Sequence, residues 1–189
     1  MSTRTHYAPG PASGAEIQKD GEKWTLVLVR DLSHPPAKVW KALTEPDDLR
    51  EWAPFDSDRS LGTVGTVKLS TVGARTPLVS ETHVKRADAP RLLEFNWGEF
   101  DIRWKLEPLG ADGTRLTLWH NIDRRFISMG AAGWHICFDV LDRLLAGQPI
   151  GRMVGPDAMK FGGWRRLNAE YAKQFGVEAP ELPPNAPKP

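Results

Sequence analysis

Hydrophobic and polar residues alternate along the middle of the chain. In residues 100–107 the sequence reads Phe-Asp-Ile-Arg-Trp-Lys-Leu-Glu, so each apolar residue is followed by a charged one. Successive side chains of a β-strand point to opposite faces of the sheet. The pattern therefore predicts a strand with one buried face and one solvated face.

Four or five such strands follow one another with no helix between them. We place them at approximately residues 63–71, 78–86, 92–97, 100–108 and 114–122. Residues 110–113 supply a turn, after which Leu116, Leu118, His120 and Ile122 continue the apolar phase. Adjacent strands joined by short turns indicate an antiparallel meander. An earlier strand is predicted at residues 23–30, where Trp24, Leu26 and Leu28 occupy one face.

Two short helices are predicted between the first strand and the meander. Residues 33–36 (SHPP) end the strand and offer Ser33 as a helix cap. Val39, Trp40 and Leu43 then recur at helical spacing, and we expect Trp40 to be a core residue. The second helix follows Pro46, and its inward face carries Leu49 and Trp52.

The last part of the chain has helical periodicity. Residues 131–146 place His135, Asp139, Asp142 and Arg143 on a polar side, where His135 and Asp139 are expected to form a solvated pair. The broad apolar side carries Trp134, Cys137, Phe138, Val140, Leu141, Leu144 and Leu145. A further helix is predicted at residues 157–174, weakened by Gly162 and Gly163. An antiparallel sheet with segregated helices is the α+β class.

The composition favours one domain with two irregular ends. Residues 1–20 are rich in Gly, Pro and Ser, which predicts a flexible N-terminal arm. Residues 178–189 contain five prolines and predict an extended Pro-rich tail. Residues 21–177 then form a single domain that includes the additional C-terminal helix.

Charge and hydropathy exclude several classes of partner. The 25 Lys and Arg residues nearly balance the 24 Asp and Glu residues, for a formal net charge of +1 with mixed signs, so we expect no nucleic-acid partner. No apolar run approaches the about 20 residues of a membrane span. The first 20 residues lack the apolar core of a signal peptide, so we expect a soluble cytoplasmic protein. The single cysteine, Cys137, is expected to pack as a small buried hydrophobe.

Four stretches resemble a known superfamily. They are residues 31–46 (DLSHPPAKVWKALTEP), 49–52 (LREW), 114–120 (TRLTLWH) and the pair Gly133 and Trp134. In order and spacing they resemble the SRPBCC superfamily, also called START-like or birch-pollen-allergen-like. Within it they are similar to homologues of the activator of heat-shock-protein-ninety ATPase.

The resemblance implies a helix-grip fold, in which a curved antiparallel sheet wraps around a long C-terminal helix and two short helices close one end. It also implies a cavity for a lipid, sterol, polyketide or plant hormone, and some members of the superfamily are enzymes. The chain departs from the minimal domain through its additional C-terminal helix and tail. The separate N-terminal domain of the eukaryotic activators is absent from this sequence.

Nine residues are predicted to line such a cavity. The strand phase and the helix phase give Phe95, Trp97, Ile102, Trp104, Leu118, His120, Trp134, Phe138 and Leu141 as candidates for ligand binding. The alternative is that these residues simply fill the core. His120 shares the inward phase of Leu118, where its imidazole either orients a ligand or bonds within the protein.

Catalytic and metal motifs are not found. There is no Gly-x-Ser-x-Gly elbow, no phosphate loop, no paired cysteines and no histidine pair at metal spacing, so we predict no catalytic residue, no metal and no cofactor. The leading hypothesis is a module that binds a small hydrophobic or amphipathic molecule. Two alternatives stay open: a cyclase, dehydratase or hydrolase that uses the same cavity, and a chaperone-linked protein-interaction module.

Overall fold

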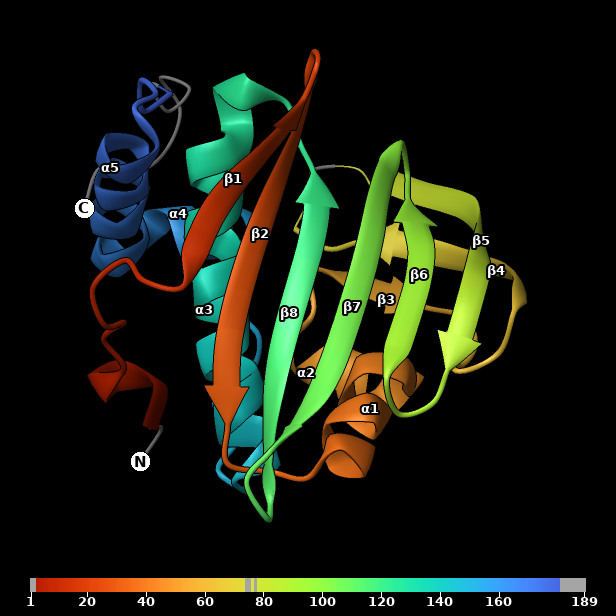
Figure 1. Ribbon diagram of the computed structural model, residues 1–189. Helices are drawn as coiled ribbons and strands as arrows, with labels where there is room; N and C mark the ends of the chain where they lie inside the picture. The colour runs from red at the N-terminus through yellow and green to blue at the C-terminus, as the bar shows by residue number, and fades with distance from the viewer. Residues whose placement is uncertain (1–2, 74–75, 77, 181–189) are drawn as a thin grey trace.

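One curved antiparallel sheet organises the chain. The computed structural model describes residues 3–73, 76 and 78–180 (Figure 1). The sheet has eight strands in the order β1-β2-β8-β7-β6-β5-β4-β3. Their bounds are β1 Ala15–Asp20, β2 Lys23–Leu32, β3 Phe55–Ser57, β4 Gly65–Thr71, β5 Leu78–Asp88, β6 Leu92–Trp97, β7 Phe100–Leu109 and β8 Gly113–Asn121. All neighbouring strands pair antiparallel, so the predicted meander is confirmed.

The helices lie on one side of the sheet and at one of its ends. They are α1 Pro36–Thr44, α2 Pro46–Trp52, α3 Ile127–Leu145, α4 Gly155–Lys160 and α5 Gly162–Phe175, with short 3-10 turns η1 Thr3–His6 and η2 Arg124–Phe126. Figure 1 shows the sheet curling around α3, while α1 and α2 lie near one end of β7. This arrangement confirms the predicted α+β helix-grip fold.

The apolar strand phase faces α3. The register sets Trp104 opposite Leu118 and Ile102 opposite His120 on neighbouring strands, and all four side chains are buried. From α3, Phe138 packs against Trp104 with ring centroids 5.8 Å apart. Such contacts remove apolar surface from water and stabilise the sheet–helix interface. The predicted buried face of this strand is confirmed for Ile102, Trp104 and Leu106.

The N-terminal segment is more ordered than the predicted flexible arm. Residues Ala15–Asp20 form β1, in which Ala15 lies opposite Leu28 of β2, and Tyr7 is only 6% exposed. The prediction of an arm without core contacts is therefore wrong for these residues. Its composition misled us because an edge strand is held by backbone hydrogen bonds, which need few large apolar side chains. Of the predicted Pro-rich tail, residues 181–189 lie outside the described residues.

Several helix boundaries also differ from the prediction. Ser33 does not cap α1, since Pro35 occupies the N-cap position and makes no side-chain bond. The helix predicted at residues 157–174 is two helices, because Phe161 adopts extended backbone angles (φ −80°, ψ 125°). The two glycines that follow Phe161 lower helix propensity at this point. The sequences of the short strand β3 and of the first turn of α3 show no clear periodicity, so neither segment was predicted.

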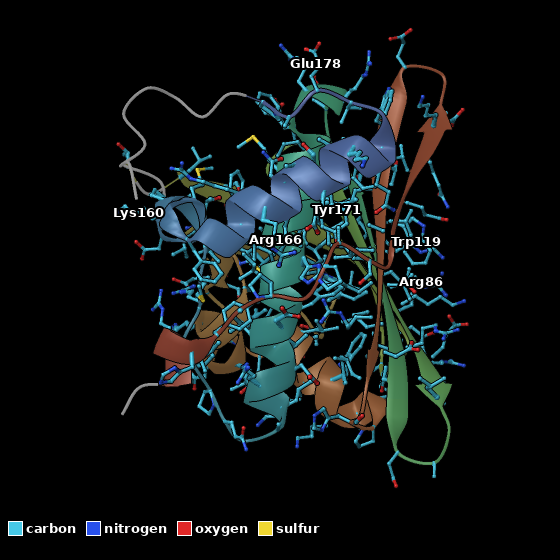
Figure 2. All side chains as sticks on the ribbon, turned by 90° about the vertical axis from the view of Figure 1, so that its left-hand side faces the viewer. Arg86, Trp119, Lys160, Arg166, Tyr171 and Glu178 are labelled. Atoms are coloured by element: carbon cyan, nitrogen blue, oxygen red, sulfur yellow. The ribbon has the colours of Figure 1, made fainter. Side chains whose placement is uncertain are left out.

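His135 and Asp139 of α3 do pair, with 3.7 Å between Nε2 of His135 and Oδ2 of Asp139, but the pair is largely buried and not solvated as predicted. His135 is 3% exposed, and its Nδ1 lies 2.7 Å from the hydroxyl oxygen of Tyr171 on α5. Asp139 accepts a hydrogen bond of 2.6 Å from the Tyr7 hydroxyl and a further one from Arg30. Figure 2 shows α5 lying across α3, with Tyr171 between them. A helix that packs on two sides must satisfy its polar residues internally.

The two tryptophans of the short helices differ in burial. Trp52 is 1% exposed, donates from Nε1 to the Ala42 carbonyl at 2.9 Å and packs edge-on against Trp104. Trp40, which we predicted to be a core residue, is only partly buried and packs against the outside of the core.

We therefore expect Trp52→Ala to lower the free energy of unfolding by about 3 to 5 kcal/mol, as large-to-small substitutions in a core do. Trp40→Ala is the matched control and should cost clearly less, because less apolar surface is lost. Denaturant titration of both variants measures the difference. Equal losses would contradict the packing described for α1 and α2.

Candidate functional site

A cavity of about 270 Å³ lies beside the solid part of the core. Its walls come from the end of the sheet, from α3, and from the segment that includes α4 and the start of α5. The lining residues are Pro54, Trp97, Phe100, His120, Ile122, Phe126, Met129, Gly130, Gly133, Trp134, Cys137, Met153, Val154, Gly155, Ala158, Met159 and Trp164. None of these side chains is an acid, a lysine or an arginine, so the walls are almost wholly apolar.

Glycine on α3 creates the hollow. Met129, Gly133 and Cys137 are four residues apart, so they form one stripe of the helix toward the cavity. A Cβ atom added at Gly133 would meet no heavy atom within 4 Å outside its own helix backbone, whereas one at Gly130 would lie 2.8 Å from Cδ1 of Ile122. The missing side chain at Gly133 therefore leaves space that a larger residue would occupy.

The segment after α3 forms the opposite wall. Arg152 donates to Asp56 at 2.7 Å and so ties this segment to β3. Gly155 begins α4 with φ +56°, and a Cβ there would lie 3.1 Å from the Cα of Gly73 in the β4–β5 connection. Only glycine allows this close approach of two backbones with that φ. These contacts set Met153, Val154 and Met159 against the cavity.

The geometry around His120, a polar residue of the cavity lining, defines the tautomer of its imidazole. Its Nδ1 accepts a hydrogen bond of 2.9 Å from the indole N–H of Trp134. Because Nδ1 must use its lone pair, the neutral imidazole carries its hydrogen on Nε2. Burial of the ring, which is 3% exposed, lowers the pKa of His120 from 6.5 to about 4. Nε2 is itself buried and has no hydrogen-bond partner among the described residues.

Nucleophilic and metal chemistry have little support at this site. Burial raises the pKa of the Cys137 thiol to about 12, so the group stays protonated and unreactive. Within the described residues, no three His, Cys, Asp or Glu side chains are grouped as a metal ion requires. In the same part of the chain, no helix is long and apolar enough to cross a membrane.

The structure brings together three of the nine predicted ligand-binding residues. Trp97, His120 and Trp134 line the cavity. The other six are buried in the core outside the cavity: Phe95, Ile102, Trp104, Leu118, Phe138 and Leu141. Trp104 and Phe138 are in direct contact, so there is no hollow between them.

Most of the lining was missed by reasoning from the sequence. Phe126, Met153, Met159 and Trp164 lie in loops and terminal helices, whose position against the sheet has no local signal. The glycines were the available signal: Gly130 and Gly133 are unfavourable inside a helix, so their presence in α3 points to a tertiary requirement.

The comparisons with known proteins agree with this fold. A family model described as activator of Hsp90 ATPase homolog 1-like protein matches residues 33–146. No curated protein matches the sequence.

Solved structures share the architecture at low sequence identity. A conserved protein of unknown function from Enterococcus faecalis, EF2215, superposes with a TM-score of 0.64 at 17% identity, covering 87% of this chain and 92% of its own. CalU16 from Micromonospora echinospora gives a TM-score of 0.60 at 20% identity, covering 90% and 97%. An AHSA1-like protein from Aeromonas hydrophila gives 0.51 at 15% identity, covering 64% and 92%. At these identities the likeness concerns the fold alone.

The buried histidines predict that acid destabilises the protein. Burial lowers the pKa of both His120 and His135, so the unfolded chain takes up protons first, near pH 6.5. The stabilisation from the neutral His120 is complete above pH 6.5 and is lost as the pH falls toward about 4. Over this range the neutral His120 accounts for a fall of about 3 kcal/mol in the free energy of unfolding.

Denaturant titrations at several pH values between 7.5 and 4 measure this loss. Because carboxylates also titrate below pH 5, the same series on His120→Gln gives the contribution of His120 by difference. A difference between the two proteins that does not change with pH would contradict the buried neutral imidazole.

Proposed function

The chain belongs to the activator of Hsp90 ATPase homolog 1-like protein family, and from that premise we propose that it binds a small hydrophobic or amphipathic molecule in the cavity beside α3. The observation that carries the proposal is the apolar lining of a cavity whose size suits a small organic molecule. An apolar ligand gains roughly 25 cal/mol for each Å² of its surface that leaves water.

The mouth of the cavity supports the same function. Phe100 is 39% exposed and Phe126 is 47% exposed, and both line the cavity. Exposed apolar surface that is continuous with a cavity is typical of a ligand-binding groove. Met129, Met153 and Met159 add flexible thioether side chains, which adapt to ligands of irregular shape.

An enzymatic use of the cavity has less support. Proton transfer by His120 needs an acidic or hydroxyl partner, and the lining residues include neither. With a pKa of about 4, His120 is a poor proton donor near neutral pH.

An interaction module that uses an exposed apolar face also has less support. The exposed large hydrophobic residues of the described chain lie on several different elements: Val64, Leu78, Val79, Phe100, Leu109 and Phe126.

The cytoplasmic location that we expect from the sequence stays a prediction.

Filling the hollow tests the proposal. Gly133→Leu places a side chain where the added Cβ meets no neighbour, so the fold is kept, and replacing glycine within a helix adds up to about 1 kcal/mol of stability. We expect this variant to lose binding of the neutral fluorescent probe N-phenyl-1-naphthylamine. Gly133→Ala is the control, because one methyl group fills little of the cavity, and it should bind nearly as the parent does.

Probe fluorescence and thermal midpoints of the three proteins are measured together. Binding that persists in Gly133→Leu would place the probe elsewhere. A parent protein that takes up no probe would remove the proposal.

A further inference from the structure

His120, which lines the cavity, has a buried hydrogen-bond donor that the protein leaves unused. Two indole groups of the cavity are already paired: Trp97 donates to Oγ1 of Thr71 at 2.9 Å, and Trp134 donates to Nδ1 of His120 at 2.9 Å. The second bond leaves the hydrogen of His120 on Nε2. That atom is buried with no acceptor among the described residues.

A buried N–H without an acceptor destabilises a protein, because the group has lost its bonds to water. Most such groups in folded proteins find a partner. The rings of Trp97 and Phe100, with centroids 6.0 and 5.1 Å from the imidazole, offer Nε2 no oxygen or nitrogen lone pair to accept its hydrogen. The missing acceptor is therefore one that a bound molecule can supply.

We infer that the molecule held in this cavity is neutral and carries a carbonyl-type or ether-type oxygen, which accepts a hydrogen bond from Nε2 of His120. The inference rests on the proposed binding function and names the chemical class of the ligand. His120 acts here as a specificity-determining residue, because it distinguishes molecules that are alike in shape by the presence of one oxygen.

The same geometry excludes other ligands. A cation or a metal ion cannot bind Nε2 while that atom carries the hydrogen. A carboxylate could accept the bond, but no lysine or arginine lines the cavity to compensate its charge. Burying an unpaired charge in an apolar site is strongly unfavourable. A neutral acceptor remains, and a carbonyl or ether oxygen is the kind that we assign.

Access to Nε2 requires a small movement of an adjacent ring. Phe100 packs edge-on against His120 and is 39% exposed, so its outer side faces solvent. Exposed side chains change rotamer on short timescales. A ligand that enters at the mouth can displace this ring and bring its oxygen to the imidazole.

Two molecules of nearly equal shape test the inference. 2-Acetylnaphthalene has a C=O group where 2-isopropenylnaphthalene has C=CH₂. The alkene is the more hydrophobic, so burial alone favours it. We expect the parent protein to bind the ketone roughly tenfold more tightly, the value of one buried hydrogen bond. Calorimetric titration measures both affinities, and 2-naphthoate, the charged control, should bind more weakly than the ketone.

The variant His120→Phe keeps a ring at this position and removes the donor. In it the ketone should lose its advantage, while binding of the alkene is retained. Because this change also leaves the Trp134 indole without its acceptor, a second measurement uses the parent protein. The C=O stretching band of the bound ketone should lie at lower wavenumber than in an apolar solvent.

The outcomes separate the two proposals. If both naphthalenes bind equally, or the alkene binds more tightly, the assignment of His120 is overturned while the binding function stands. An unshifted C=O band overturns it as well. If neither molecule nor the neutral fluorescent probe binds the parent, the binding function itself fails.

Discussion

The packing of Trp134 against the concave face of the sheet is the contact on which the arrangement of core and cavity depends. The centroid of its ring lies 5.5 Å from that of Trp104 and 6.2 Å from that of Trp97, both on the sheet. The centroid of the Trp52 ring, on α2, is 6.5 Å away. Clustered aromatic rings bury large areas and prefer such tilted geometries. One side chain of α3 thus joins the long helix, the short helices and the sheet, and its indole N–H fixes the tautomer of His120.

On either side of Trp134 the space between sheet and helix is used differently. Toward the C-terminal end of α3, Phe138 and Leu141 fill the space, and the core is solid. Toward its N-terminal end, Gly133 leaves the cavity open, while Gly130 allows Ile122 to approach the helix closely. Close packing is the usual state of a protein interior, so a hollow persists only where no side chain can reach.

The N-terminal segment and α5 support the wall of the cavity from outside. Tyr7 stacks on Phe161, between α4 and α5, with ring centroids 5.6 Å apart. Arg166 of α5 donates to the Pro9 carbonyl at 2.6 Å, and Tyr171 donates to the Ser13 carbonyl at 3.0 Å. The first residues of the chain therefore help to position α4 and Trp164, although they are distant in sequence from the residues that line the cavity.

The sequence by itself determined the strands with a solvated face and the amphipathic helices. In residues 101–107 the period of two is complete, because one face of the strand is buried and the other meets water. The resemblance to a known family then supplied the topology. The phase of β8 also placed His120 inward, and the structure agrees.

Only the tertiary structure decided which inward residues line a cavity and which fill the core. Phe95 and Trp97 share a strand face, yet of the two only Trp97 lines the cavity, whose other walls come from distant elements such as α3 with Gly133. His135 had the local pattern of a solvated residue and is buried because α5 packs over it. Local periodicity records which side of an element avoids water; contacts between distant segments determine what covers that side and how completely.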